Sequence, residues 1–174
     1  MSVIRESLPH DAIILPDSGS HWLWAMRLLE CRFPNSILPG RSFGAMGQAT
    51  AGAIGAKLAS PERPVVAITG DGSFLMHGTE IAAAVNLGLP LTWVVFNDRS
   101  HNRIYTAQRL DFNGRIIATT LPHIDFSQVA AGFKLWSRRV SDIDQLNGAI
   151  RSSLRHPGPS LVEVMVSREV TPPL

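Results

Sequence analysis

The chain has 174 residues, of which 45% are hydrophobic and 17% charged, so it is long and apolar enough to form one domain with a substantial core. Sixteen Lys and Arg side chains are balanced by fourteen Asp and Glu, which leaves a formal net charge of +2, and the only lysines are Lys57 and Lys134. Because nucleic-acid binding depends on clustered basic side chains, this composition argues against a DNA- or RNA-binding role.

Neither a membrane segment nor a disulfide framework is predicted. No apolar run reaches the roughly 18 residues that a membrane span needs, and residues 1–10 lack the apolar centre of a signal peptide. The single cysteine, Cys31, excludes internal disulfides and Cys-based zinc sites. It follows Leu28 and Leu29 in a helical pattern, so we expect a small buried hydrophobic residue rather than a nucleophile. A soluble cytoplasmic protein is therefore expected.

Short apolar runs alternate with helical patterns along the chain, which is typical of an α/β domain with a mainly parallel sheet. The expected strands are 12–15, a short 37–38, 65–69, 91–96, 134–138 and 160–166. The expected helices are 20–31, 47–58, 79–87, 125–132 and 143–154. Residues 97–124 are polar and irregular, and they predict an active-site loop that contains a short helix. We expect residues 1–174 to form a single doubly wound domain with helices on both faces of the sheet.

Polar corners follow two of the apolar strands. Gly70-Asp71-Gly72-Ser73 comes after strand 65–69, and Asn97-Asp98-Arg99-Ser100 comes after strand 91–96. Ligands of doubly wound sheets bind beyond the carboxyl ends of the strands, and glycines there let backbone N–H groups approach a phosphate. Carboxylate, amide and carbonyl oxygens suit a hard cation such as Mg²⁺. The two corners together predict a metal ion that joins the protein to a diphosphate.

Each corner taken alone has a simpler interpretation. Gly-Asp-Gly also forms tight turns in which the Asp caps a helix, and Asn-Asp after a strand also simply starts a loop. Neither corner contains the G-x-G-x-x-G dinucleotide pattern or a P-loop with its lysine. The spacing, with 24 residues between Gly72 and Asn97, favours a shared site.

Gly-Asp-Gly followed at this distance by an Asn-Asn pair is the signature of thiamine diphosphate-dependent enzymes, and the chain resembles that family. It is most similar to the C-terminal diphosphate-binding domain of acetolactate synthase and related 2-oxo acid decarboxylases, over about residues 10–170. The similarity is carried by Gly44-Ala45-Met46-Gly47, residues 52–57, residues 65–74, and Gly19-Ser20-His21 followed by Trp24-Ala25.

The resemblance implies thiamine diphosphate and Mg²⁺ as cofactors. For the metal it implies the carboxylate of Asp71, the side chain of Asp98 and the backbone carbonyl of Ser100. Asp98 stands where the family has its second Asn, a change that keeps a hard oxygen ligand and adds a negative charge.

The resemblance also implies which residues hold the cofactor. Gly70, Gly72 and Ser73 would hold the diphosphate through N–H and hydroxyl groups, and Ser20 and His21 resemble the pair that contacts it. Met46 resembles the large apolar residue that wedges the cofactor into its bent form, and the Gly44 carbonyl would accept from its 4′-amino group. His21 as an ordinary loop histidine and Met46 as a core residue remain alternatives.

Activation of the cofactor in this family needs a glutamate from a separate pyrimidine-binding domain. No segment of the 174 residues is left over to form that domain, and Glu30 and Glu80 lie in predicted helices as solvated residues. We therefore expect a diphosphate-binding β subunit of a two-chain decarboxylase or carboligase, which forms a hetero-oligomer with a pyrimidine-binding α subunit and acts on a small 2-oxo acid. Arg103 and Arg109 could bind a substrate carboxylate or lie at a surface or subunit contact.

Two other functions remain open. A non-catalytic cofactor-binding or scaffold subunit would explain both the missing glutamate domain and the Asp at position 98. A nucleotide- or flavin-binding domain is less favoured, since the glycine fingerprint of such domains is absent.

Overall fold

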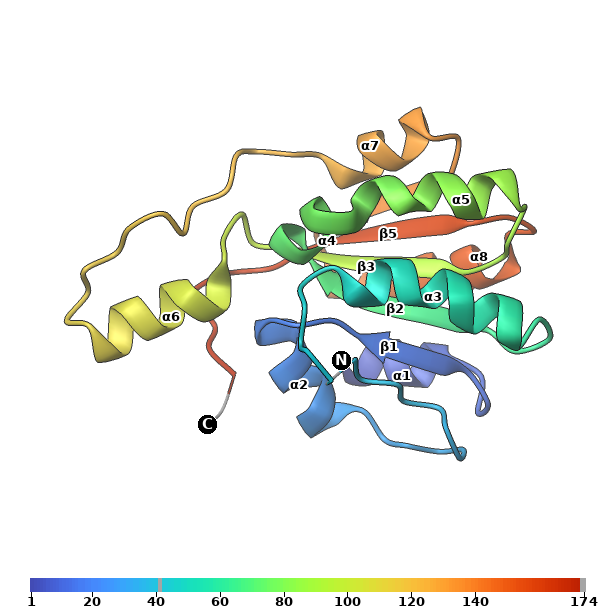
Figure 1. Ribbon diagram of the computed structural model, residues 1–174, viewed down its shortest axis with the longest axis horizontal. Helices are drawn as coiled ribbons and strands as arrows, with labels where there is room; N and C mark the ends of the chain where they lie inside the picture. Colours follow the sequence, from blue (N-terminus) through green and yellow to red (C-terminus); the bar gives the residue numbers. More distant parts are fainter. Residues whose placement is uncertain (41, 173–174) are drawn as a thin grey trace.

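The computed structural model describes residues 1–40 and 42–172, and within them five parallel strands form one sheet with helices on both faces (Figure 1). Residues 173–174 of the expected domain lie outside the described residues. The strands are β1 (Ile13–Pro16), β2 (Val65–Gly70), β3 (Thr92–Asn97), β4 (Trp136–Val140) and β5 (Ser160–Met165), in the order β1-β2-β3-β5-β4. The predicted doubly wound, parallel α/β class is confirmed.

One helix precedes the first strand, and the others lie between the strands in the sequence. They are α1 (Ser2–Ser7), α2 (Ser20–Leu28), α3 (Gln48–Ala59), α4 (Asp71–His77), the 3₁₀ turn η1 (Gly78–Glu80), α5 (Ile81–Asn86), α6 (Asn102–Asp111), α7 (Phe126–Gly132) and α8 (Ile143–Arg155). Among the described residues, no helix is both long and apolar enough to cross a bilayer.

The core consists of two apolar layers, one on each face of the sheet. One layer lies under α3, α5 and α7, and the other lies under α1, α2 and α8. Strands β2, β3 and β5 are buried almost throughout, because both of their faces are covered. This explains why β2 and β3 appear in the sequence as nearly continuous apolar runs rather than as alternating patterns.

Trp93 joins the central strand to α3. Its side chain is 0% exposed, and its indole N–H donates to the Thr50 carbonyl at 3.1 Å. A fully buried indole contributes a large apolar area, and its one polar atom has a partner here. Trp93 therefore fixes how α3 packs on the sheet.

Several local expectations differ from the structure. The helix expected over 79–87 begins earlier, because α4 starts at Asp71 and η1 and α5 follow it directly. Gly72 and Gly78 lower the helix propensity of this stretch and so conceal its start. The strand expected at 37–38 is reduced to one parallel bridge between Ile37 and Ile14, and β4 lies two residues later than 134–138.

The expectation of a buried Cys31 is wrong. Helix α2 ends at Leu28 rather than at residue 31, so the cysteine is not part of the helical face that packs on the core. It is exposed, and its Sγ lies 3.4 Å from the Phe33 carbonyl. The short helix α1 has no counterpart in the sequence prediction; it is stabilised by burial of Ile4 in the core layer of α8.

The carboxyl ends of β1, β2 and β3 meet at one edge of the sheet. Helix α6 and the segment 112–125 extend beyond this same edge before the chain returns to α7 (Figure 1). The helix predicted inside the 97–124 loop is α6, and it is ten residues long. Both predicted polar corners therefore lie at this edge.

Replacing Trp93 with Ala should lower the free energy of unfolding by about 3–5 kcal/mol, because it leaves a cavity between β3 and α3 and removes a buried hydrogen bond. Denaturant titration should show a lower midpoint. As a control, Leu110→Ala, at a side chain that is 57% exposed on α6, should change stability by no more than about 0.5 kcal/mol. Equal losses in the two variants would contradict this account of the core.

Candidate cofactor-binding site

A cavity of ≈ 620 Å³ opens at the carboxyl edge of the sheet. Nine of the ten residues predicted for the site line it: Ser20, His21, Met46, Gly70, Asp71, Gly72, Ser73, Asp98 and Ser100. The tenth, Gly44, is one hydrogen bond away, since the hydroxyl of the lining residue Ser18 donates to the Gly44 carbonyl at 2.7 Å. The structure thus brings the predicted residues together around one space.

Asp71 connects the two predicted corners. It is the first residue of α4 and is only 4% exposed. One carboxylate oxygen accepts from the Gly72 N–H at 2.7 Å, and the other accepts from the Ser100 N–H at 3.2 Å. Burial raises the pKa of this carboxyl group, and the surrounding backbone N–H groups oppose that change.

Asp98 lies close enough to Asp71 for the two charges to interact. Burial, and after it the negative charge of Asp71, raise the pKa of Asp98 to about 7. Its Oδ1 is buried and has no hydrogen-bond partner among the residues described, and the same holds for the Ser100 hydroxyl. Buried oxygens that lack a partner beside a second carboxylate fit a site for a hard cation.

The protein side chains would not hold such a cation alone. Within residues 1–40 and 42–172, no three His, Cys, Asp or Glu side chains come together as a metal-binding group. A cation beside Asp71 and Asp98 would therefore need backbone and ligand oxygens as well. This donor set suits Mg²⁺, which prefers one or two carboxylates combined with phosphate oxygens.

His21 forms part of the cavity wall as a neutral ring. It is 7% exposed and hydrogen-bonds to the Asp17 backbone, while its Nε2 is buried with no partner in the described part of the chain. Burial lowers the pKa of His21 to about 4, so the ring is uncharged at neutral pH. A Cβ at Gly70 would lie 2.9 Å from His21 Nδ1, which explains the need for glycine at that position.

Asp17 is a site residue that the sequence analysis missed. It is 2% exposed at the end of β1, and it accepts from the Ser18 N–H at 2.8 Å, the Gly47 N–H at 3.1 Å and the Thr69 hydroxyl at 3.1 Å. It therefore holds the ends of β1 and β2 and the start of α3 together. An Asp directly after an apolar strand was the available signal.

Two of the predicted hydroxyl groups already have partners within the protein. Ser73 donates to the Ser18 carbonyl at 2.7 Å, which leaves its backbone N–H for a ligand. Ser20 donates to the Asn102 side-chain oxygen at 2.8 Å, and this contact joins α2 to α6. Asn102 also lines the cavity, although the sequence did not single it out for the site.

The two arginines after the second corner differ in position. Arg103 is exposed and lines the cavity. Arg109 forms an ion pair with Glu169 at 2.6 Å instead. Of these two, Arg103 is thus the one that lines the cavity.

Residues 17–164 match the family described as thiamine pyrophosphate enzyme, C-terminal TPP binding domain. The chain belongs to this family. The resemblance seen in the sequence is therefore confirmed, and thiamine diphosphate is the cofactor of the family.

Similar proteins agree with this assignment. The chain is 32% identical over 176 residues to a putative acetolactate synthase large subunit of Mycobacterium tuberculosis, covering 99% of this chain and 31% of the relative. It is 29% identical to the large subunit of acetolactate synthase isozyme 1 of Escherichia coli, covering 97% and 30% of the two chains. The chain therefore spans about a third of the length of these relatives.

A solved structure shows the same fold. The thiamine diphosphate-dependent 4-hydroxybenzoylformate decarboxylase of Rhodococcus jostii superposes with a TM-score of 0.88 at 26% identity, covering 95% of this chain and 31% of that one. The likeness therefore extends over nearly the whole chain and corresponds to one part of a larger enzyme.

The raised pKa of Asp98 predicts a pH-dependent stability. In the unfolded chain this carboxyl loses its proton near its ordinary value of 3.8, whereas in the folded chain it does so near 7. The folded state therefore holds the proton more tightly, and Asp98 makes the protein less stable as pH rises from about 4 through about 7. Asp98→Asn removes this contribution.

In denaturant titrations with a chelator present, the variant should gain stability relative to the unmodified chain between pH 5 and pH 8. A difference that stays constant over this range would show that the ionised Asp98 carries no penalty in the folded chain.

Proposed function

We propose that the chain binds the diphosphate of thiamine diphosphate through Mg²⁺, as the diphosphate-binding part of a 2-oxo acid decarboxylase or carboligase. The observation that carries this proposal is the convergence of Asp71 and Asp98, with a carboxylate oxygen that lacks a partner in the described structure, on a cavity at the carboxyl edge of the sheet. We assign residues 1–174 to one diphosphate-binding domain.

The proposed roles follow from the chemistry of each group. Asp71, Asp98 and the Ser100 carbonyl would bind Mg²⁺, since all three supply hard oxygens. The diphosphate would be held by the backbone N–H groups of the first corner, Gly70, Gly72 and Ser73. Ser20 and His21 at the start of α2 would contact it as well. Met46 and the Gly44 carbonyl would hold the body of the cofactor.

When bound, the cofactor would supply the carbon that adds to the 2-oxo acid and would accept the electron pair left when CO₂ departs. The residues of this chain bind and orient it, and their burial excludes water from the diphosphate. None of the described residues that line the cavity is a glutamate, and Glu30 and Glu80 are exposed elsewhere. We therefore propose that the activating glutamate comes from a pyrimidine-binding α subunit, so that the working enzyme is a hetero-oligomer of two kinds of chain.

Support for this class of reaction comes from the relatives, which are named as acetolactate synthases and as a decarboxylase. The second candidate, a non-catalytic cofactor-binding subunit, is favoured by one feature: at position 98 an ionisable carboxyl stands beside Asp71. The two candidates differ in turnover and share cofactor binding, so binding and CO₂ release need separate measurements.

Asp71→Ala should weaken the binding of thiamine diphosphate in the presence of Mg²⁺ by about 100-fold or more, because it removes the carboxylate that joins the two corners. Isothermal titration calorimetry at fixed Mg²⁺ measures this directly. The control is Asp144→Ala, an exposed carboxylate in the first turn of α8, which should bind the cofactor as tightly as the unmodified chain. Unchanged affinity in Asp71→Ala would refute the metal site.

Thiamine diphosphate-dependent CO₂ release from a 2-oxo acid should require both polypeptides. The chain would be purified with and without the protein encoded beside its gene, provided that protein has the features of a pyrimidine-binding domain. We expect release by the mixture and none by either protein alone. Release by the isolated chain would contradict the two-chain arrangement, and cofactor binding by a mixture that releases no CO₂ would favour the scaffold role.

A further inference from the structure

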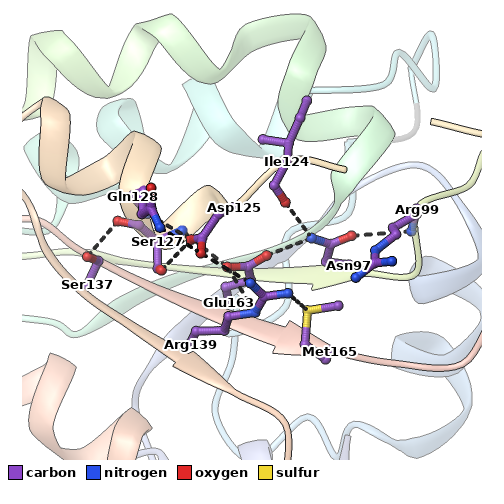
Figure 2. A network of polar contacts seen from close by, with 10 residues as sticks. All are labelled: Asn97, Arg99, Ile124, Asp125, Ser127, Gln128, Ser137, Arg139, Glu163 and Met165. Carbon is purple, nitrogen blue, oxygen red and sulfur yellow. Dashed lines mark hydrogen bonds and ion pairs between the residues drawn. The ribbon is translucent and has the colours of Figure 1, made fainter. Parts of the chain in front are cut away.

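A buried polar network lies directly behind the second corner of the site, at the carboxyl ends of β3, β5 and β4 (Figure 2). Its centre is Glu163 of β5, which is 0% exposed. One carboxylate oxygen of Glu163 accepts from the Asn97 amide at 2.6 Å, and the other accepts from the Ser127 N–H at 3.2 Å. The proposed function assigns no role to this carboxylate.

A basic side chain on the edge strand β4 offsets part of the charge of Glu163. Arg139 is the register partner of Glu163 on β4, and its Nε lies 3.9 Å from the second carboxylate oxygen. The same guanidinium pairs with Asp125 at 3.1 Å, and Asp125 caps α7 by accepting from the Gln128 N–H. Because a buried carboxylate is tolerated only with such compensation, Glu163 is held in one position.

Asn97 transmits this position to the candidate metal loop. It is the residue immediately before Asp98, and its side-chain NH₂ donates to both Glu163 and the Ile124 carbonyl. With both N–H groups used in this way, the side-chain oxygen must point toward the loop, where it accepts from the Arg99 N–H at 3.2 Å (Figure 2). The orientation of this amide is therefore set by its acceptors behind the loop.

The loop needs such support because its backbone is strained. Arg99 has a φ of 60°, in the left-handed region that residues with a side chain adopt at a cost. The adjoining Ser100 N–H donates to Asp71, so the turn also determines how the two corners face each other. Release of Asn97 would let the turn relax and would move Asp98 relative to Asp71.

We infer that Glu163 is a positioning residue for the metal loop: through Asn97 it fixes residues 98–100, and thereby places Asp98 and Ser100 opposite Asp71. The inference rests on the proposed function insofar as the loop binds Mg²⁺. The ordering of the loop itself does not depend on that assignment.

Glu163→Gln is the sharpest variant, because it keeps the shape of the side chain and changes only its hydrogen bonding. The carboxylate accepts from two donors, Asn97 and Ser127, whereas an amide has one oxygen and one NH₂ group. Whichever way the glutamine turns, its NH₂ meets one of those donors. Either the Asn97 amide loses its acceptor at residue 163 and can change orientation, or the Ser127 N–H at the start of α7 loses its acceptor.

The matched control is Thr92→Val, which removes a buried polar contact between the same two strands at the opposite edge of the sheet. Thr92 on β3 lies 3.0 Å, oxygen to oxygen, from Ser160 on β5. Both variants should lower the thermal unfolding midpoint, so a general loss of stability cannot distinguish them. The two variants are distinguished only by their effect on the loop of residues 98–100.

Two measurements read out the loop. Amide hydrogen exchange followed by NMR should be at least about tenfold faster at Arg99 and Ser100 in Glu163→Gln and unchanged there in Thr92→Val. In calorimetric titrations with thiamine diphosphate, the Mg²⁺ concentration for half-saturation should rise by about 10–100-fold in Glu163→Gln only, as is typical when a residue behind a metal ligand is changed.

The inference is overturned if Glu163→Gln leaves exchange at Arg99 and Ser100 unchanged, or if Thr92→Val accelerates it equally. If Glu163→Gln does not fold, Asn97→Ala tests the same link, since it leaves the Glu163–Arg139 pair in place; normal exchange in that variant would also overturn the inference. An unmodified chain that fails to bind thiamine diphosphate at any Mg²⁺ concentration would refute the proposed function instead, and the exchange result would still decide whether Glu163 orders the loop.

Discussion

The site is organised around two carboxylates buried beside each other at the carboxyl edge of a parallel sheet. Asp71 receives two backbone N–H groups, one from each corner, whereas an oxygen of Asp98 is buried with no partner in the described residues. Two like charges in such surroundings are stable only if one carboxyl keeps its proton or a cation neutralises them. Burial, together with the repulsion from Asp71, raises the pKa of Asp98 to about 7. The fold therefore presents a negative site whose natural complement is a divalent cation carrying an anionic ligand.

The same edge leaves little room for side chains around the carboxylates. A Cβ at Gly70 would meet the buried ring of His21, and a Cβ at Gly72 would lie 2.6 Å from Nδ1 of His101. The glycines thus expose backbone between two rings, and backbone N–H groups are the donors that a phosphate needs. Asp17, directly after β1, supports this arrangement because it accepts from the Thr69 hydroxyl at the end of β2 and from the Gly47 N–H before α3. The space left by the glycines and the backbone N–H groups therefore favour an anionic ligand such as a phosphate, as does a cation bound between the two carboxylates.

The sequence correctly predicted the strands and corners that have a recognisable pattern of neighbouring residues. Strands 65–69 and 91–96 were confirmed within a residue, because strands covered on both faces read as unbroken apolar runs. The glycine and carboxylate corners were located because they directly follow those strands. Asp17 and Glu163 were missed, since a single acidic residue after or within a strand is the whole local signal, and most of the groups that bind them lie far away in the sequence: Gly47 and Thr69 for Asp17, and Asn97 and Ser127 for Glu163. Cys31 was misplaced because α2 ends at Leu28, so that the cysteine lies beyond the helix whose face packs on the core.

The strand order explains how one network can serve both the core and the site. The chain passes from β3 to β4 at the sheet edge and then returns to insert β5 between them. This places Glu163 beside Asn97 on one side and Arg139 on the other. Two pairs of acidic groups then lie on either side of Asn97: Glu163 with Asp125, which share the positive charge of Arg139, and Asp71 with Asp98, which the proposed Mg²⁺ would neutralise. The neutral amide of Asn97 separates them. Its hydrogen bonds link the position of Glu163 to that of the metal loop, and the amide itself is uncharged. The loop can therefore be held in one conformation while the charges of Asp71 and Asp98 remain available for a ligand.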